Sequence, residues 1–158
     1  MSIYAQNTVV SVERSRAEIE AILSRYGATA FAYATNMDKA MIKFQASNRH
    51  IMFVLQLPDR EAKIFTHGYA GKGRKLGGDE AYRKWEQACR QKWRCLSLAI
   101  KAKLESVESG IASFEDEFMA HILMPDGKTV SQHTAPMIQQ AYDSGKMQPL
   151  LPDFSGKK

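Results

Sequence analysis

The stretch from Asp79 to Gly110 is apolar at every third or fourth position. Its apolar side chains are Tyr82, Trp85, Cys89, Trp93, Leu96, Ile100, Leu104 and Val107. Because an α-helix brings residues three and four apart onto one side, this spacing predicts a helix of about 28 residues. Asp79 is a suitable N-cap for that helix, and Gly110 a suitable stop. Its single apolar stripe, Trp85 and Trp93 included, is expected to pack on a sheet.

The first half of the chain supplies that sheet and a second helix. Residues 11–26 carry apolar positions on one side and charges on the other, which predicts an amphipathic helix between Ser11 as N-cap and Gly27 as stop. Apolar runs separated by short turns that contain Asn, Asp or Ser predict a three-stranded antiparallel meander. The strands are expected at residues 31–35, 39–45 and 51–57.

The segments on either side of the long helix have weaker patterns. Residues 59–78 mix charge with glycine and are expected to form a loop with a mobile tip. After Gly110, a pattern at Ser113 that resembles a capping box predicts one short helix. The last helix is expected to have Pro136 in its first turn and to end at Gly145.

The expected fold is one α+β domain over residues 1–152, followed by a polar, basic tail at 153–158. Its elements are an N-terminal helix, a three-stranded antiparallel meander, a long amphipathic helix and short C-terminal helices. A chain of 158 residues with 44% apolar residues is long enough to bury a core of its own. Cys89 and Cys95 lie on nearly opposite faces of the long helix, so we expect reduced thiols. Without a signal peptide or an apolar run of about 20 residues, the protein is expected in the cytoplasm, with no membrane partner.

Positive charge is concentrated in residues 60–103, which hold 12 Lys or Arg and 4 Asp or Glu, whereas the whole chain has a net charge of +5. A strip of polar side chains, mostly cations, runs along the long helix beside its apolar stripe. The strip consists of Arg83, Gln87, Arg90, Arg94, Ser97 and Lys101. Evenly spaced cations suit a phosphate backbone, since each neutralised phosphate releases counterions. The alternative interpretation is that the strip is only the solvated face that a long helix needs.

The glycine-rich loop before the long helix extends this basic region. Its cations Lys72, Arg74 and Lys75 are flanked by glycines and are predicted to contact phosphates. Tyr69, in the same loop, is the aromatic side chain predicted to contact the ligand. The glycines also resemble a phosphate-binding loop in front of a helix, although they match neither established spacing.

Catalytic and metal-binding patterns are few. The four histidines have no close mutual spacing and none pairs with a cysteine at metal-ligand distance, so neither a metal nor another cofactor is predicted. Glu117 and His121, four residues apart, are the weakest alternative, an acid–base pair of a small enzyme; such a pair is more often a surface interaction. We therefore expect no catalytic residues and a non-enzymatic protein.

Several segments resemble those of a widespread family of small proteins of tailed phages and prophages. The resemblance covers nearly the whole chain and is carried by Val12–Glu20, Trp93-Arg94, Ile100–Glu105, Phe114–Phe118, Leu123–Val130 and Leu150–Pro152. It implies a phage origin and the cytoplasm of a host cell, and it assigns no site residues. It favours two functions: handling of DNA in replication or recombination, and blocking of a host defence.

The leading hypothesis is a sequence-tolerant nucleic-acid-binding accessory protein of phage DNA replication or recombination. Backbone contacts position a protein without reading bases, and DNA rather than RNA is the expected partner. The alternative is an anti-defence protein that inhibits a host nuclease or effector complex by binding it. That protein would use either the same cations or the acidic segment 105–117 as a nucleic-acid mimic. A symmetric homo-oligomer through the long helix remains open.

Overall fold

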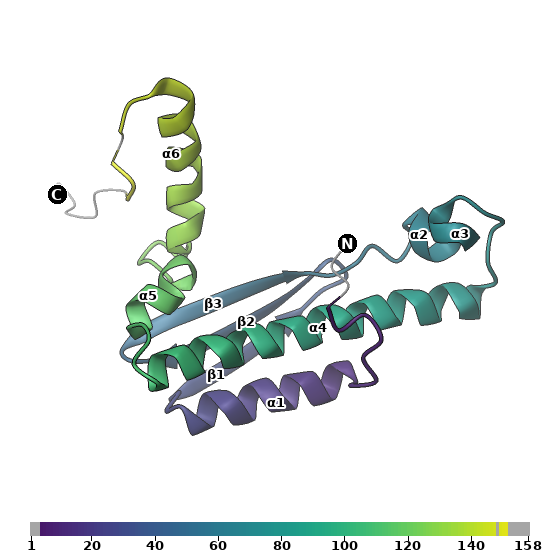
Figure 1. Cartoon of the computed structure of the whole chain (residues 1–158), viewed down its shortest axis with the longest axis horizontal. Coiled ribbons are helices and arrows are strands. Elements are labelled where there is room, and N and C mark those ends of the chain that lie inside the picture. The colour runs from purple at the N-terminus through teal and green to yellow at the C-terminus, as the bar shows by residue number, and fades with distance from the viewer. Residues whose placement is uncertain (1–3, 148, 152–158) are drawn as a thin grey trace.

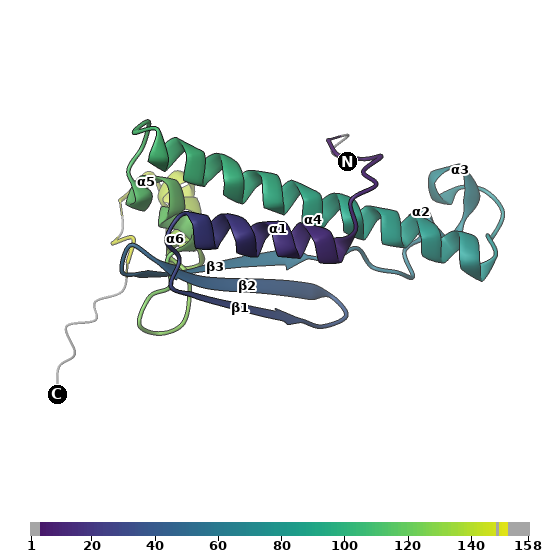
Figure 2. The same cartoon turned by 90° about the horizontal axis from the view of Figure 1, so that it is seen from below.

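A computed structural model of the chain describes residues 4–147 and 149–151. Three antiparallel strands form one sheet in the order β1-β2-β3, and two helices lie side by side on one face of it (Figure 1, Figure 2). The strands are β1 (Ala30–Thr35), β2 (Lys39–Ala46) and β3 (Arg49–Gln56), and the helices are α1 (Val12–Arg25) and α4 (Gly78–Glu108). The predicted α+β class and meander are therefore confirmed.

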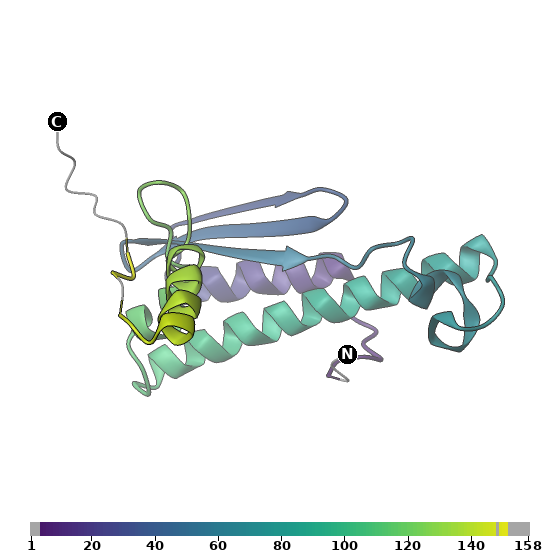
Figure 3. The same ribbon diagram turned by 90° about the horizontal axis from the view of Figure 1, so that it is seen from above.

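The remaining elements lie at the two ends of α4. At the end that extends past the sheet, the first of two single-turn helices packs against α4 and the second packs on the first. At the other end, α5 and a 3-10 turn close the core and α6 projects outward (Figure 1, Figure 3). These elements are α2 (Lys63–Thr66), α3 (Gly68–Gly71), α5 (Phe114–Phe118), η1 (Met119–His121) and α6 (Val130–Ser144).

The core lies between the sheet and the two helices. On β2, alternate residues from Ala40 to Ala46 are buried, as the pleat of a strand with one covered face requires. Trp93 of α4 is 2% exposed and its ring lies 5.5 Å from that of Tyr33, so its predicted place in the core is confirmed. Trp85 is only half-buried, and its indole N–H donates to the Pro58 carbonyl at 2.8 Å.

Local capping decides where the helices begin and end. Ser11 caps α1 as predicted, because its hydroxyl accepts a hydrogen bond from the Arg14 amide, and Gly145 ends α6 with a φ of 67°. The predicted N-cap Asp79 is wrong. The cap is Gly77, which offers no side-chain bond, and Asp79 lies in the first turn, where its carboxylate favours the positive end of the helix dipole.

Two further boundaries differ from prediction. Helix α6 begins at Val130, six residues before Pro136, because Thr129 and Gln132 form a reciprocal capping box that satisfies two amides. The segment expected to be a plain loop contains α2 and α3.

The predicted tail at 153–158 lies outside the described residues. None of the helices in the described part of the chain combines the length and apolar composition that a membrane crossing needs.

Candidate nucleic-acid interface

A basic lobe, residues 60–84, forms the end of the molecule beyond the sheet. It contains α2, α3 and the first two turns of α4. Because these turns of α4 extend beyond the sheet, the lobe projects from the rest of the molecule (Figure 1). Its attachment uses rings of α4: the Arg60 guanidinium lies 5.2 Å from the Tyr82 ring centre and 5.8 Å from that of Trp85. These contacts fix the lobe on a rigid helix.

The tip of the lobe is an ordered hairpin held by backbone hydrogen bonds. The Gly68 amide donates to the Arg74 carbonyl at 2.9 Å, and the Gly73 amide donates to the Gly68 carbonyl at 2.8 Å. A third bond joins the Leu76 amide to the Thr66 carbonyl at 2.8 Å. The chain turns between them through Tyr69, whose φ of 46° is in the left-handed region. The predicted mobile tip is therefore built as a closed turn.

Gly73 is the position on which this turn depends. A Cβ atom there would lie 2.7 Å from the Tyr69 ring, 2.9 Å from the Gly68 carbonyl carbon and 3.0 Å from its oxygen, which is closer than real Cβ atoms approach. We expect Gly73→Ala to open the turn and to raise the rate of tryptic cleavage after Lys75 about tenfold, since cleavage follows the open population.

The matched control is Gly77→Ala. A Cβ at Gly77 meets nothing within 4 Å and its φ is −64°, so the cleavage rate should stay near that of the wild type. Mass spectrometry of the first peptides released measures both rates. Equal rates for the two variants would contradict a close-packed turn.

Unpaired cations cover the surface of the basic lobe. It holds seven Lys or Arg and three Asp or Glu, a net charge of +4. Of these seven cations, only Lys84 forms an ion pair with a described residue, Glu80, at 3.9 Å. Besides Arg60, which lies over the Tyr82 and Trp85 rings, five exposed cations of the lobe have no carboxylate partner in the described part of the chain: Lys63, Lys72, Arg74, Lys75 and Arg83. Tyr69 is 90% exposed, as a stacking residue would need to be.

Sequence reasoning assigned no role to Arg60 and Lys63, because they precede the glycine-rich segment. The fold brings Arg60 and Lys75 to the same hollow of about 330 Å³ at the start of α4, with Thr66 and Tyr82 also in its wall. Glu61 lines the hollow too, and a carboxylate there opposes an anion. We therefore place phosphate contacts on the outer cations of the lobe rather than inside the hollow.

The strip on α4 is divided by contacts with the N-terminal part of the chain. Arg94 forms an ion pair with Glu18 of α1, whereas Arg90 pairs within α4 itself, with Glu86 at 2.9 Å. Ser97 is 2% exposed. The reason is geometric: side chains that border an apolar stripe are those that a second packed helix reaches first. The middle of the strip therefore makes contacts within the protein and is not free to bind phosphates.

The ends of the strip are free of this packing. Arg83 and Lys101 are exposed, and they lie at opposite ends of α4. Gln87, between Arg83 and the middle of the strip, donates to the carbonyls of Gln6 and Thr8 at 3.0 and 2.9 Å, so it fastens the N-terminal segment. Of the strip, only Arg83 lies in the basic lobe.

Glu117 and His121 do not form a joint site. Helix α5 ends at Phe118, so the four-residue spacing does not run along one helix. The Lys103 ammonium lies 3.3 Å from the Glu117 carboxylate. A hydrogen bond from the Ser106 hydroxyl is the main cause that lowers the pKa of Glu117, and the hydrogen bond from Lys103 is the second. The His121 ring stacks on Phe53 at 3.9 Å, and burial lowers its pKa. Each side chain thus has a structural role of its own.

Metal-ligating and thiol groups are dispersed. Among the described residues, no three His, Cys, Asp or Glu side chains gather as a metal site would require. Cys89 and Cys95 are both free, as predicted, and burial raises the pKa of Cys89 to about 11. A thiol with so high a pKa is a poor nucleophile at neutral pH.

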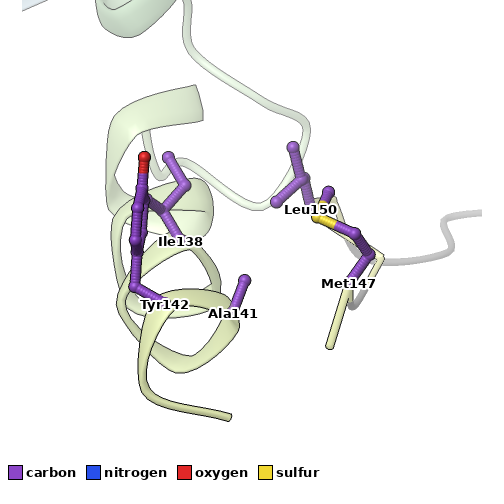
Figure 4. Close-up of a pocket in the computed structure, with 5 residues that line it drawn as sticks. All are labelled: Ile138, Ala141, Tyr142, Met147 and Leu150. Carbon is purple, nitrogen blue, oxygen red and sulfur yellow. The ribbon is translucent and has the colours of Figure 1, made fainter. Parts of the chain in front are cut away.

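An apolar groove lies on α6, at the opposite end of the molecule from the basic lobe. It has a volume of about 420 Å³, and Figure 4 shows Ile138 and Tyr142 of the helix facing Met147 and Leu150 of the following segment. None of the described α6 side chains is fully buried, and Tyr142 is 85% exposed.

A comparison with protein-family models, curated proteins and solved structures finds no match to the chain.

Proposed function

We propose that this protein binds nucleic acid through the basic lobe, without catalysis and without reading the base sequence. The observation that carries the proposal is the group of exposed cations without carboxylate partners on one projecting lobe with a hydrogen-bonded tip: Lys63, Lys72, Arg74, Lys75 and Arg83. Cations held apart from acids on a rigid support neutralise phosphates and release their counterions. Cations that already pair with acids inside the fold, such as Arg94 with Glu18, contribute less.

Sequence tolerance follows from the dimensions of the lobe. Helices α2 and α3 have four residues each, too few to lie along a major groove and contact several base edges. Tyr69 supplies one exposed ring, and stacking on a base is tolerant of sequence. The resemblance to proteins of tailed phages supports a more specific role, as an accessory protein of DNA replication or recombination with DNA rather than RNA as the partner.

The test is the salt dependence of binding to labelled single- and double-stranded oligonucleotides, followed by fluorescence anisotropy. With about five phosphate contacts, the affinity for duplex DNA should fall on the order of 10²–10³-fold between roughly 50 and 200 mM salt. Absence of binding at the lower concentration, or binding that salt does not weaken, would refute the proposal. The two oligonucleotides show which strand form is preferred.

A second candidate function, inhibition of a host defence protein by direct binding, is favoured by the apolar groove of α6. An exposed apolar patch on a projecting helix is typical of protein–protein contact. Mimicry of nucleic acid by segment 105–117 has less support, because Glu115 pairs with Arg49 at 3.5 Å and Glu117 pairs with Lys103. Binding to a purified nuclease or effector complex, with no affinity for oligonucleotides, would favour this second function.

A further inference from the structure

The two edges of the sheet are treated differently. The segment after η1 covers the beginning of the outer edge of β3: the Leu123 amide donates to the His50 carbonyl at 2.8 Å, and Ile122 bridges to Ile51. On the opposite side, β1 is the last strand of the sheet, and Figure 2 shows its outer edge without a neighbouring segment among the described residues. The chain thus covers the beginning of one edge, and along β1 it leaves the other edge open.

Strand β1 also lacks the features that normally prevent an edge strand from pairing. Its sequence, Ala-Phe-Ala-Tyr-Ala-Thr, contains no charge and no proline. Its register with β2 is one-to-one from Ala30 opposite Gln45 to Thr35 opposite Ala40, so no bulge twists the edge away. Charges, prolines and bulges are the usual protection against edge-to-edge pairing. An unprotected edge of six residues accepts another strand.

The backbone groups that face outward follow from the hairpin. The Asn36 amide donates to the Lys39 carbonyl at 2.9 Å, and the direction of backbone groups alternates along an antiparallel strand. The amides and carbonyls of Phe31, Tyr33 and Thr35 therefore point away from β2. The side chains of Phe31 and Tyr33 face the helices and are half-buried, so an added strand would extend their apolar cover.

We propose that the occupant of this edge is β1 of a second copy, which pairs with it antiparallel across a two-fold axis. The result is a continuous six-stranded sheet, within the usual size of sheets. The strand is uncharged, so two copies meet without like-charge repulsion. The adjacent helix α1 carries three Arg and three Glu, and the Arg16 guanidinium lies 3.7 Å over the Tyr33 ring.

The position of the basic lobe also favours this pairing. The lobe lies beyond the hairpin end of β1, and an antiparallel two-fold arrangement sends the two lobes to opposite ends of the joined sheet (Figure 1). The charges that would repel are then as far apart as the fold allows. The dimer is independent of the proposed function; together they would give a bivalent protein with two lobes.

The test uses paired charges at Ala32 and Ala34, which are exposed on the open face of β1. Each register that joins more than one of the three outward-facing residues puts at least one of these alanines opposite Ala32 or Ala34 of the second copy. We expect the wild type to elute as a dimer by size exclusion with light scattering. Ala32→Lys/Ala34→Lys and Ala32→Glu/Ala34→Glu should each be monomeric, and their mixture should form a heterodimer.

The control is Ala99→Lys/Ala102→Lys, which makes the same charge change at exposed positions of α4 and should remain dimeric. Circular dichroism checks that each variant is folded. If one of the pair is unfolded, Ala32→Arg/Ala34→Arg and Ala32→Asp/Ala34→Asp replace it and keep a charge at both positions. A monomeric wild type would overturn the proposal. The proposal would also be overturned if only the α4 control dissociated. It would equally be overturned if the double-Lys and the double-Glu variants of Ala32 and Ala34 both remained dimeric. In either case the dimer contact would lie on α4 or α6 rather than on β1.

Discussion

Replacing Phe118 by alanine is expected to lower the free energy of unfolding by about 3–5 kcal/mol. Phe118 is completely buried, at 0% exposure, where α5 closes the end of the core. Its ring stacks on Phe114 at 4.6 Å and meets Phe44 and Phe53 edge-on at 6.0 and 6.3 Å. Alanine would leave a cavity among three aromatic rings and remove the main anchor of a five-residue helix.

Urea denaturation followed by circular dichroism measures this loss. Met119→Ala is the matched control, since Met119 is the next residue and is 50% exposed. Its effect should remain within about 0.5 kcal/mol, as is usual for surface substitutions. If Phe118→Ala cost less than about 1 kcal/mol, α5 would not be part of the core.

The layers of the fold follow from spacing that the sequence displays directly. Apolar residues three and four apart predicted α1 and α4, and apolar runs between short turns predicted the three strands. Trp93 illustrates why this works: a large apolar side chain in phase with the stripe of a long helix has no other place than the core. These predictions depend only on which side chains avoid water.

The predictions that were wrong depend on contacts between backbone and nearby residues. Pro136 suggested the start of the last helix, but the capping box of Thr129 and Gln132 begins it earlier. The ordered tip of the lobe depends on the close approach of Gly73 to Gly68, which no hydrophobic pattern indicates. Glycine-rich sequence is typical of both mobile loops and tight turns, so it could not distinguish them.

The candidate site was predictable in part for a similar reason. Lys72, Arg74 and Lys75 are exposed, as expected for charged side chains in a segment rich in glycine and without an apolar stripe. Arg94 has the same charge and was predicted to bind phosphate, yet it faces Glu18. Periodicity shows that a polar side chain borders an apolar stripe, but it does not show whether water or a second helix lies beyond it.

Reversing the three cations of the tip should abolish nucleic-acid binding. For Lys72→Glu/Arg74→Glu/Lys75→Glu we expect an affinity about 10³-fold lower at roughly 50 mM salt, because three phosphate contacts are lost and three repulsive charges replace them. All three side chains are exposed and without ion pairs in the described part of the chain, so the fold should be retained. The salt dependence should decrease as well, since fewer counterions are released.

The decisive comparison is with Arg14→Glu/Arg25→Glu/Lys101→Glu, which reverses three exposed cations outside the basic lobe. Both triple variants change the net charge from +5 to −1, so the total charge cannot explain a difference between them. If phosphates contact the lobe, the second variant should weaken binding by about tenfold or less, through long-range attraction alone. Equal losses would mean that the whole molecule, rather than the lobe, attracts the polyanion. If neither variant weakened binding, the tip would have no part in it.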